Sequence, residues 1–292
     1  MNELFSDSPS DFPADEGRTE WVLRGQRVVV GERVIPAAVH IQRGVITQVA
    51  GYDEVPPGVP VEDVGSLTIM PGLCDSHVHI NEPGRTEWEG FQTATRAAAA
   101  GGVTTLLDMP LNSIPPTTSL RGLLAKAEAA TGKLWVDVGL CGGVVPGNLG
   151  ELRPLVEHGA LAFKCFLADS GVPEFSHVGE AELRLAMPAL AELGMPLLCH
   201  AELPGPLDSA ARVFMDADPR RYATYLASRP KSAEDQAVEL VIKLCRDIGT
   251  RAHIVHLSSA DALPLLRAAR EGGAPISAET CPHYLALCAE KI

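Results

Sequence analysis

Apolar residues recur along the chain in two alternating patterns. After Pro71-Gly72, short runs rich in β-branched residues are separated by longer segments with helical spacing of apolar positions. The runs predict strands near 73–80, 103–109, 135–140, 161–167, 196–201, 252–257 and 275–281. Such alternation of strand and helix predicts a parallel α/β sheet.

The intervening segments predict helices, because each loses its apolar periodicity near a glycine, which is typical of a helix C-terminus. They span 91–102, 118–132, 151–159, 180–194, 232–249 and 259–273. Ser232 is predicted to cap the fifth of these helices, with acidic residues in its first turn. Seven consecutive units favour a TIM-like (β/α)8 barrel over an open doubly wound sheet. Because no eighth strand is found, either two strands are merged in this assignment or the chain ends before the barrel closes.

The pattern before residue 71 is different. Residues 21–70 contain short β-rich runs broken by Gly31, Gly44 and Gly58, which predict a small antiparallel unit. About fifty residues are too few for a robust independent core, so 19–70 is expected to be part of a small β-sandwich domain. Residues 1–18 are acidic and lack periodicity, which predicts a flexible tail. The barrel, with strands one to seven, is assigned to 71–292.

Charge and cysteine usage narrow the class of protein. The 292 residues carry 24 Lys and Arg against 37 Asp and Glu, a net charge of −13, which disfavours nucleic-acid or anionic-membrane partners. No apolar stretch is long enough to span a bilayer. The seven cysteines form no CxxC pair and mostly lie in apolar runs, so buried, reduced thiols and a cytoplasmic location are predicted.

The candidate chemistry lies at the predicted strand ends. His77 and His79, two residues apart on a strand, would point the same way into the mouth of a barrel. His200 and His256 end the fifth and sixth predicted strands, and neutral imidazoles suit a divalent metal such as zinc. Taken alone, His77 and His79 could be two histidines that lie at a strand end without any function. Because histidines also occur at the ends of two further predicted strands, a metal site is favoured.

Lys164 lies inside the apolar run AFKCF, where an unpaired charge is costly. A lysine desolvated near cations has a lowered pKa and could react with carbon dioxide to give a carbamate that bridges two metals. The alternative is a lysine whose stem is buried and whose ammonium reaches solvent. Of the other histidines, His253 is interpreted as structural and His283 as a candidate on the substrate side, whereas surface or core positions are assigned to His40, His158 and His177.

Several motifs together resemble allantoinases, within the cyclic amidohydrolases that include dihydroorotases and hydantoinases. They are HVHINEPGRTEWEGF, AAAAGGVTTLLDMPLNSIPPTT, AFKCFLADSGVPEF, HIVHLSSA and ETCPHY, within residues 20–290. HxH and ETCPHY occur across the whole group, whereas NEPGRTEWEGF with DMPLN and FKCF is more specific.

The resemblance implies a set of site residues and cofactors. His77 and His79 would bind one Zn²⁺, His200 and His256 a second, and carbamylated Lys164 (N6-carboxylysine) would bridge them. The metals would activate a water to attack the ring amide of allantoin, giving allantoate. Dihydroorotases have an arginine soon after HxH where this chain has Asn81, which favours a neutral substrate. Asn112, in MPLN, would be a further pocket residue.

The resemblance also predicts what the chain lacks. The family's general base is an aspartate on strand eight, which would lie beyond residue 292, so the chain is expected to be the N-terminal two-thirds of an allantoinase and inactive alone. A homotetramer is expected for the full-length protein, and a peroxisomal location stays open. Two alternatives remain: another cyclic amidase, such as a hydantoinase, dihydropyrimidinase or dihydroorotase, and an inactive truncated product acting as a scaffold.

Overall fold

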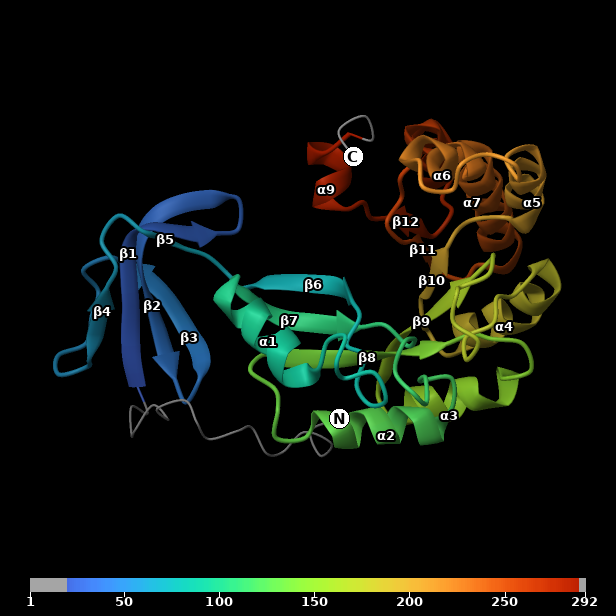
Figure 1. The fold of residues 1–292 in the computed structure, drawn as a ribbon. Coiled ribbons are helices and arrows are strands. Elements are labelled where there is room, and N and C mark those ends of the chain that lie inside the picture. The colour runs from blue at the N-terminus through green and yellow to red at the C-terminus, as the bar shows by residue number, and fades with distance from the viewer. Residues whose placement is uncertain (1–19, 289–292) are drawn as a thin grey trace.

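A computed structural model describes residues 20–288, and its largest element is a curled sheet of seven parallel strands (Figure 1). The strands pair in chain order, so that β6 and β12 form the two edges in this part of the chain. They are β6 (Leu73–Val78), β7 (Val103–Asp108), β8 (Asp137–Gly143), β9 (Ala160–Phe166), β10 (Leu197–His200), β11 (Ala252–Ile254) and β12 (Ile276–Ala278). The predicted barrel architecture with seven strands is confirmed.

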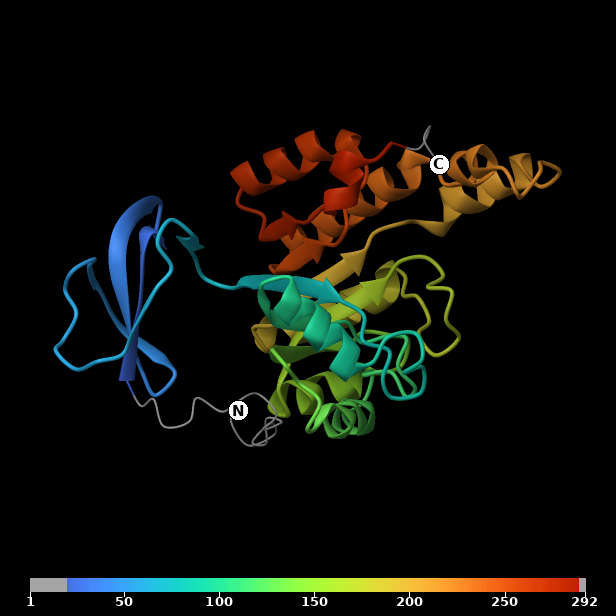
Figure 2. The same ribbon diagram turned by 60° about the vertical axis from the view of Figure 1, so that its left-hand side comes forward.

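Helices cover the outer side of this sheet (Figures 1 and 2). Six were predicted: α1 (Phe91–Ala100), α2 (Leu120–Ala130), α3 (Leu152–Glu157), α4 (Glu180–Glu192), α7 (Lys231–Ile248) and α8 (Leu263–Glu271). Others were not: α5 (Pro204–Val213), α6 (Tyr222–Ser228), α9 (Pro282–Ala286), η1 (Leu149–Glu151) and η2 (Ala260–Ala262). Neither α5 nor α6 buries a residue, so neither contributes a side chain to the core.

The start of α7 corrects the predicted cap. The helix begins at Lys231 after Pro230, whose φ of −70° and extended ψ form the turn into the helix. Ser232 therefore lies inside the first turn and caps nothing. The glycine at the other end behaves as predicted, because Gly249 has φ +85° and its N–H donates to the Cys245 carbonyl.

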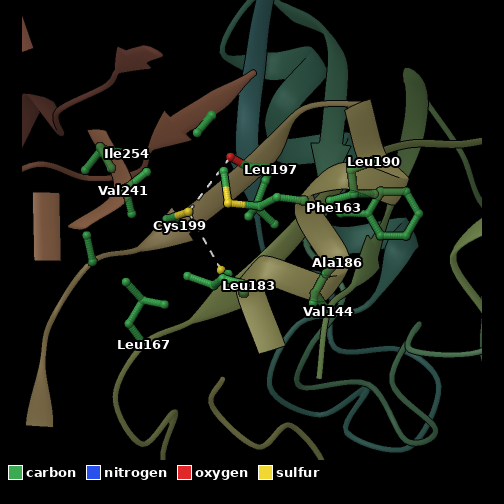
Figure 3. Packing of buried hydrophobic residues seen from close by; sticks show 14 of the residues in the cluster. Val144, Phe163, Leu167, Leu183, Ala186, Leu190, Leu197, Cys199, Val241 and Ile254 are labelled. Atoms are coloured by element: carbon green, nitrogen blue, oxygen red, sulfur yellow. Dashed lines mark hydrogen bonds between the residues drawn. The ribbon is translucent and has the colours of Figure 1, made fainter. Parts of the chain in front are cut away.

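The main core lies between the sheet and its helices. In Figure 3, Phe163 and Cys199 from the sheet pack with Leu183 and Leu190 from α4. Along β9, Phe163 and Cys165 belong to this outer core, whereas Ala162 and Phe166 belong to a second cluster on the concave side of the sheet. Because side chains alternate along a strand, Lys164 also faces the concave side.

The N-terminal strands form a separate five-stranded sheet, joined to the barrel by the chain between β5 and β6 (Figure 1). They are β1 (Glu20–Val30), β2 (Arg33–Gln42), β3 (Val45–Gly51), β4 (Val61–Asp63) and β5 (Thr68–Ile69). The predicted antiparallel pairing is confirmed for β1, β2 and β3 but is wrong for β4 and β5, which pair with β1 in parallel. The connection 52–60 brings the chain back to β1 as β4, and the short connection 64–67 leads on to β5 along the same strand.

The N-terminal tail and the cysteines were the subject of two further predictions. The predicted flexible tail at 1–18 lies outside the described residues. All seven cysteines are free thiols, and Cys141, Cys165, Cys199 and Cys245 are buried as predicted, whereas Cys74 and Cys288 are exposed and Cys281 is half-buried, contrary to the prediction. Among residues 20–288, none of the helices combines the length and apolar character needed to cross a bilayer.

Candidate metal centre

The structure brings the five predicted ligands together at one end of the curled sheet. His77 lies in β6, Lys164 in β9 and His200 in β10, while His79 directly follows β6 and His256 lies two residues after the end of β11. The Lys164 Nζ is 3.3 Å from His77 Nε2, and the ring centroids of His200 and His256 are 4.7 Å apart. The His77 ring connects the two groups, at 5.5 Å from the His79 ring and 5.3 Å from the His256 ring.

Strand geometry accounts for this convergence. Side chains two residues apart on a strand point to the same side of the sheet. His77 and His79 therefore lie on the same side of the sheet as Lys164 on β9. Carboxyl ends of parallel strands meet at one edge, which brings His200 and His256 to the same place from neighbouring strands. His256 has φ +40°, so the backbone turns sharply where its side chain enters the centre.

Lys164 is the most unusual member of the group. Its side chain is fully buried, and among residues 20–288 it has no carboxylate within salt-bridge distance. The Phe166 ring lies 5.3 Å from its Nζ. Burial lowers the pKa of Lys164 to about 8. The amine therefore loses its proton at a lower pH than that of an exposed lysine, and full burial does not fit the alternative of an ammonium that reaches solvent.

His79 and His256 are in the neutral form that binds metals. Burial, helped by the nearby Lys164, lowers the pKa of His79 to about 3. Burial and the neighbouring His200 likewise lower the pKa of His256 to about 3. Both imidazoles are consequently neutral at physiological pH, so each offers a lone pair.

The residues present fit a pair of divalent cations. His200 Nδ1 and His256 Nε2 face each other at 3.1 Å, and two nitrogens bound to one tetrahedral zinc lie roughly 3.3 Å apart at Zn–N of ~2.05 Å. His79 Nδ1 is buried without a hydrogen-bond partner among the described residues, a cost that coordination would remove. Within residues 20–288, no three His, Cys, Asp or Glu side chains converge as a complete metal site. Each histidine pair therefore needs a further ligand, and the nearest candidate is Lys164, whose Nζ lies 3.3 Å from His77 Nε2.

Comparison with known proteins decides the family. Residues 68–290 match the sequence profile of the Amidohydrolase family. The chain belongs to this family. The amidohydrolase is 48% identical to allantoinase from Streptomyces avermitilis over 94% of its own length and 61% of that protein. It is 47% identical to the mitochondrial allantoinase of Aquarana catesbeiana, over 93% of its own length and 55% of that protein. The chain thus spans about 55 to 61% of the length of these two curated relatives.

Solved structures show the same fold. The amidohydrolase superposes on L-hydantoinase from Arthrobacter aurescens with a TM-score of 0.87 and 30% identity, covering 92% of its own chain and 60% of that one. Dihydropyrimidinase from Brevibacillus agri gives a TM-score of 0.81 at 28% identity, with coverage of 92% and 59%. The resemblance to allantoinases and their relatives is confirmed.

Two glutamates that sequence reasoning missed contact the outward side of the histidines. Glu279 Oε1 lies 2.6 Å from His77 Nδ1, and Glu202 Oε2 lies 2.8 Å from His200 Nε2. Hydrogen bonding to His200 holds the pKa of Glu202 below its usual value despite burial. A sequence signal existed for both, since Glu202 follows His200 by two residues and Glu279 begins ETCPHY.

A buried ion pair supports the end of β6. Asp108, the last residue of β7, accepts a hydrogen bond from the Ile80 N–H at 2.7 Å, directly after His79. Its other oxygen is 2.5 Å from Lys126 Nζ, and both side chains are fully buried. Burial raises the pKa of Asp108 to about 6, opposed by Lys126. The pair thereby couples α2 to the backbone that carries the HxH residues.

The three predicted substrate residues lie in different environments. Asn81 is buried beside the HxH residues, and its Oδ1 has no hydrogen-bond partner among residues 20–288. Asn112 is half-buried with φ +76°, and its carbonyl accepts a hydrogen bond from Arg85. His283 is exposed on α9, where its ring packs against Tyr284 rather than against the histidines of the centre.

Of the remaining histidines, His253 lies near the centre and three others lie away from it. His253 faces the concave side and lies 3.3 Å from Glu279, with its other nitrogen 2.8 Å from Ser277 Oγ. His40 hydrogen-bonds the Glu54 carbonyl in the N-terminal sheet, while His158 and His177 are exposed. These three lie away from the centre, as predicted.

Proposed function

We propose that this amidohydrolase acts as an allantoinase, hydrolysing the hydantoin-ring amide of allantoin to allantoate. The observation that carries the proposal is the convergence of Lys164 with two histidine pairs, in a chain 48% identical to a relative named allantoinase. Since the chain spans 61% of that relative, the proposal concerns the activity of the whole protein.

The proposed centre holds two Zn²⁺ ions. His77 and His79 would hold one and His200 and His256 the other, with carbamylated Lys164 between them. When bound, the ions would polarise the ring carbonyl and lower the pKa of a water molecule toward neutrality.

The environment of Lys164 supports the carbamate. Its neutral amine can attack carbon dioxide, so that an N–C bond forms, one proton leaves to solvent and a carboxylate with two donor oxygens results. These oxygens would supply the anionic ligand that each histidine pair lacks. They would also neutralise part of the positive charge of the metals, which a buried ammonium would only increase.

Asn81 supports a neutral ring substrate. Its buried Oδ1 can accept a hydrogen bond from a ring N–H, and the amide carries no charge that would attract a substrate carboxylate. We include Asn112 in the same pocket because its loop is tied by Arg85 to the loop that follows Asn81. A substrate role for His283 stays a prediction.

Hydantoin hydrolysis is the second candidate, because the fold superposes on L-hydantoinase with a TM-score of 0.87. Turnover of allantoin, hydantoin, dihydrouracil and dihydroorotate by the protein of natural length separates the candidates. Allantoin should give the highest kcat/KM. A clear preference for hydantoin would overturn the assignment of substrate and leave the family unchanged.

The metal centre is tested by Lys164→Ala, with Lys243→Ala as the control for an exposed lysine. Metal-free protein in buffer stripped of carbon dioxide is loaded with zinc, with and without bicarbonate. The native protein and the control should bind two equivalents only when bicarbonate is present. Two equivalents bound by Lys164→Ala would refute the carbamate.

A further inference from the structure

The two ring nitrogens of His77 have different surroundings. Nε2 points into the centre, 3.3 Å from Lys164 Nζ, whereas Nδ1 points outward, 2.6 Å from Glu279 Oε1. His200 is turned the other way, with Nδ1 toward His256 and Nε2 toward Glu202. The inward nitrogen therefore differs between the two histidines.

A carboxylate only accepts hydrogen bonds, so the nitrogen that faces it must carry the proton. Glu279 consequently selects the Nδ1–H form of His77 and leaves the Nε2 lone pair directed into the centre. A free neutral imidazole prefers the Nε2–H form, which would direct an N–H toward the centre. His77 thus depends on an acceptor at Nδ1 in a way that His200 does not.

Glu279 is itself held firmly. Its backbone N–H donates to the Ile254 carbonyl at 3.0 Å, and its carbonyl accepts from the Leu257 N–H at 2.7 Å, which ties it to the end of β11. Its Oε2 lies 3.3 Å from His253 Nε2 and 3.4 Å from Ser76 Oγ.

The contact also joins distant parts of the chain. Glu279 and His77 are separated by 202 residues and come from the segments at the two edges of the seven-stranded sheet. One side chain therefore connects the segment after β12 with the HxH residues of β6.

We propose that Glu279 is a positioning residue that fixes His77 in the Nδ1–H form and thereby presents Nε2 to the metal. The inference rests on the metal centre proposed above. It assigns a function to the first residue of ETCPHY, which contacts no other proposed ligand.

The direct test is the ring protonation of His77 in protein labelled with ¹⁵N-histidine, read from two-bond ¹H–¹⁵N correlations and assigned with His77→Gln. The metal-free native protein should show His77 as Nδ1–H. Glu279→Met, similar in length but without an acceptor, should shift His77 toward Nε2–H, and Glu279→Gln, which keeps an acceptor oxygen, should restore Nδ1–H. An Nε2–H form in the native protein would overturn the proposal even if the variants fail to fold.

Zinc affinity measured by chelator competition supplies a second readout. Glu279→Met should weaken binding of one zinc about 10–100-fold, the usual cost of losing such a contact. Glu174→Ala, which removes a carboxylate paired with Arg85 at 3.1 Å, should leave affinity unchanged. In a His77→Ala background, Glu279→Met should have no further effect.

The outcomes distinguish the two proposals. Failure of the native protein to bind zinc would refute the metal centre. Normal zinc binding by the native protein, with unchanged affinity and unchanged His77 protonation in Glu279→Met, would refute only the role of Glu279.

Discussion

Lys126→Met probes the buried ion pair that supports the HxH residues. Lys126 and Asp108 are both fully buried, with Nζ and Oδ2 2.5 Å apart, and Lys126 also donates to the Met109 carbonyl at 3.3 Å. Methionine retains most of the length and apolar stem of lysine but removes the cation. The Asp108 carboxylate would then be buried without its counter-charge.

The expected cost is about 3–5 kcal/mol of unfolding free energy, the range for removing one partner of a buried pair. The cost depends on pH. Even beside Lys126, burial raises the pKa of Asp108 from 3.8 to about 6. Between pH 3.8 and about pH 6, Asp108 binds more protons in the folded protein than in the unfolded chain. The stability linked to Asp108 is therefore present at low pH and lost as the pH rises through this range. Without Lys126 the pKa rises further, so the loss continues above pH 6.

The assay is urea denaturation followed by circular dichroism at about pH 5 and about pH 7.5, where the variant should be closer to native stability at the lower pH. Lys243→Met is the control, because Lys243 is an exposed α7 lysine 3.8 Å from Glu180. The double variant Asp108→Asn with Lys126→Met removes both charges and should recover much of the loss. A Lys126→Met protein as stable as the Lys243→Met control, or equally destabilised at both pH values, would refute the reasoning.

Two further substitutions test local packing by urea denaturation. Gly122→Ala should lower the free energy of unfolding, although alanine favours helices by up to ~1 kcal/mol, because a Cβ at Gly122 would lie 2.1 Å from the Pro116 carbonyl oxygen. Gly150→Ala is the control, because there is open space around Gly150. A Gly122→Ala protein that is more stable than the native protein would contradict the packing of α2. Leu190→Ala, at a fully buried α4 position, should cost about 2–5 kcal/mol. Leu185→Ala, in the same helix but 64% exposed, should stay within ~0.5 kcal/mol, and equal costs would show that the assigned α4 face is wrong.

Much of the barrel could be predicted because its elements are defined locally. Strands such as β9 bury both faces and read as apolar runs, and α4 and α7 each carry an apolar stripe that ends at a glycine. Helices α5 and α6 were not predicted, and neither contributes a buried residue to the core. The parallel return of β4 and β5 beside β1 was also missed, because each strand is only two or three residues long and its partner, β1, lies more than thirty residues earlier in the sequence.

For the candidate site, the sequence by itself determined which residue types stand at the strand ends. His77, Lys164 and His200 were found because strand periodicity assigns a side chain to a face without knowledge of its partners. Contacts across the fold were decided only by tertiary structure: Glu279 reaches His77 over 202 residues, and Lys126 meets Asp108 from a neighbouring helix. Periodicity is a property of consecutive residues and can be read from the sequence. The partner of a buried charged side chain instead depends on which distant segments pack together. The low dielectric of that packed interior then sets the pKa of the buried side chain.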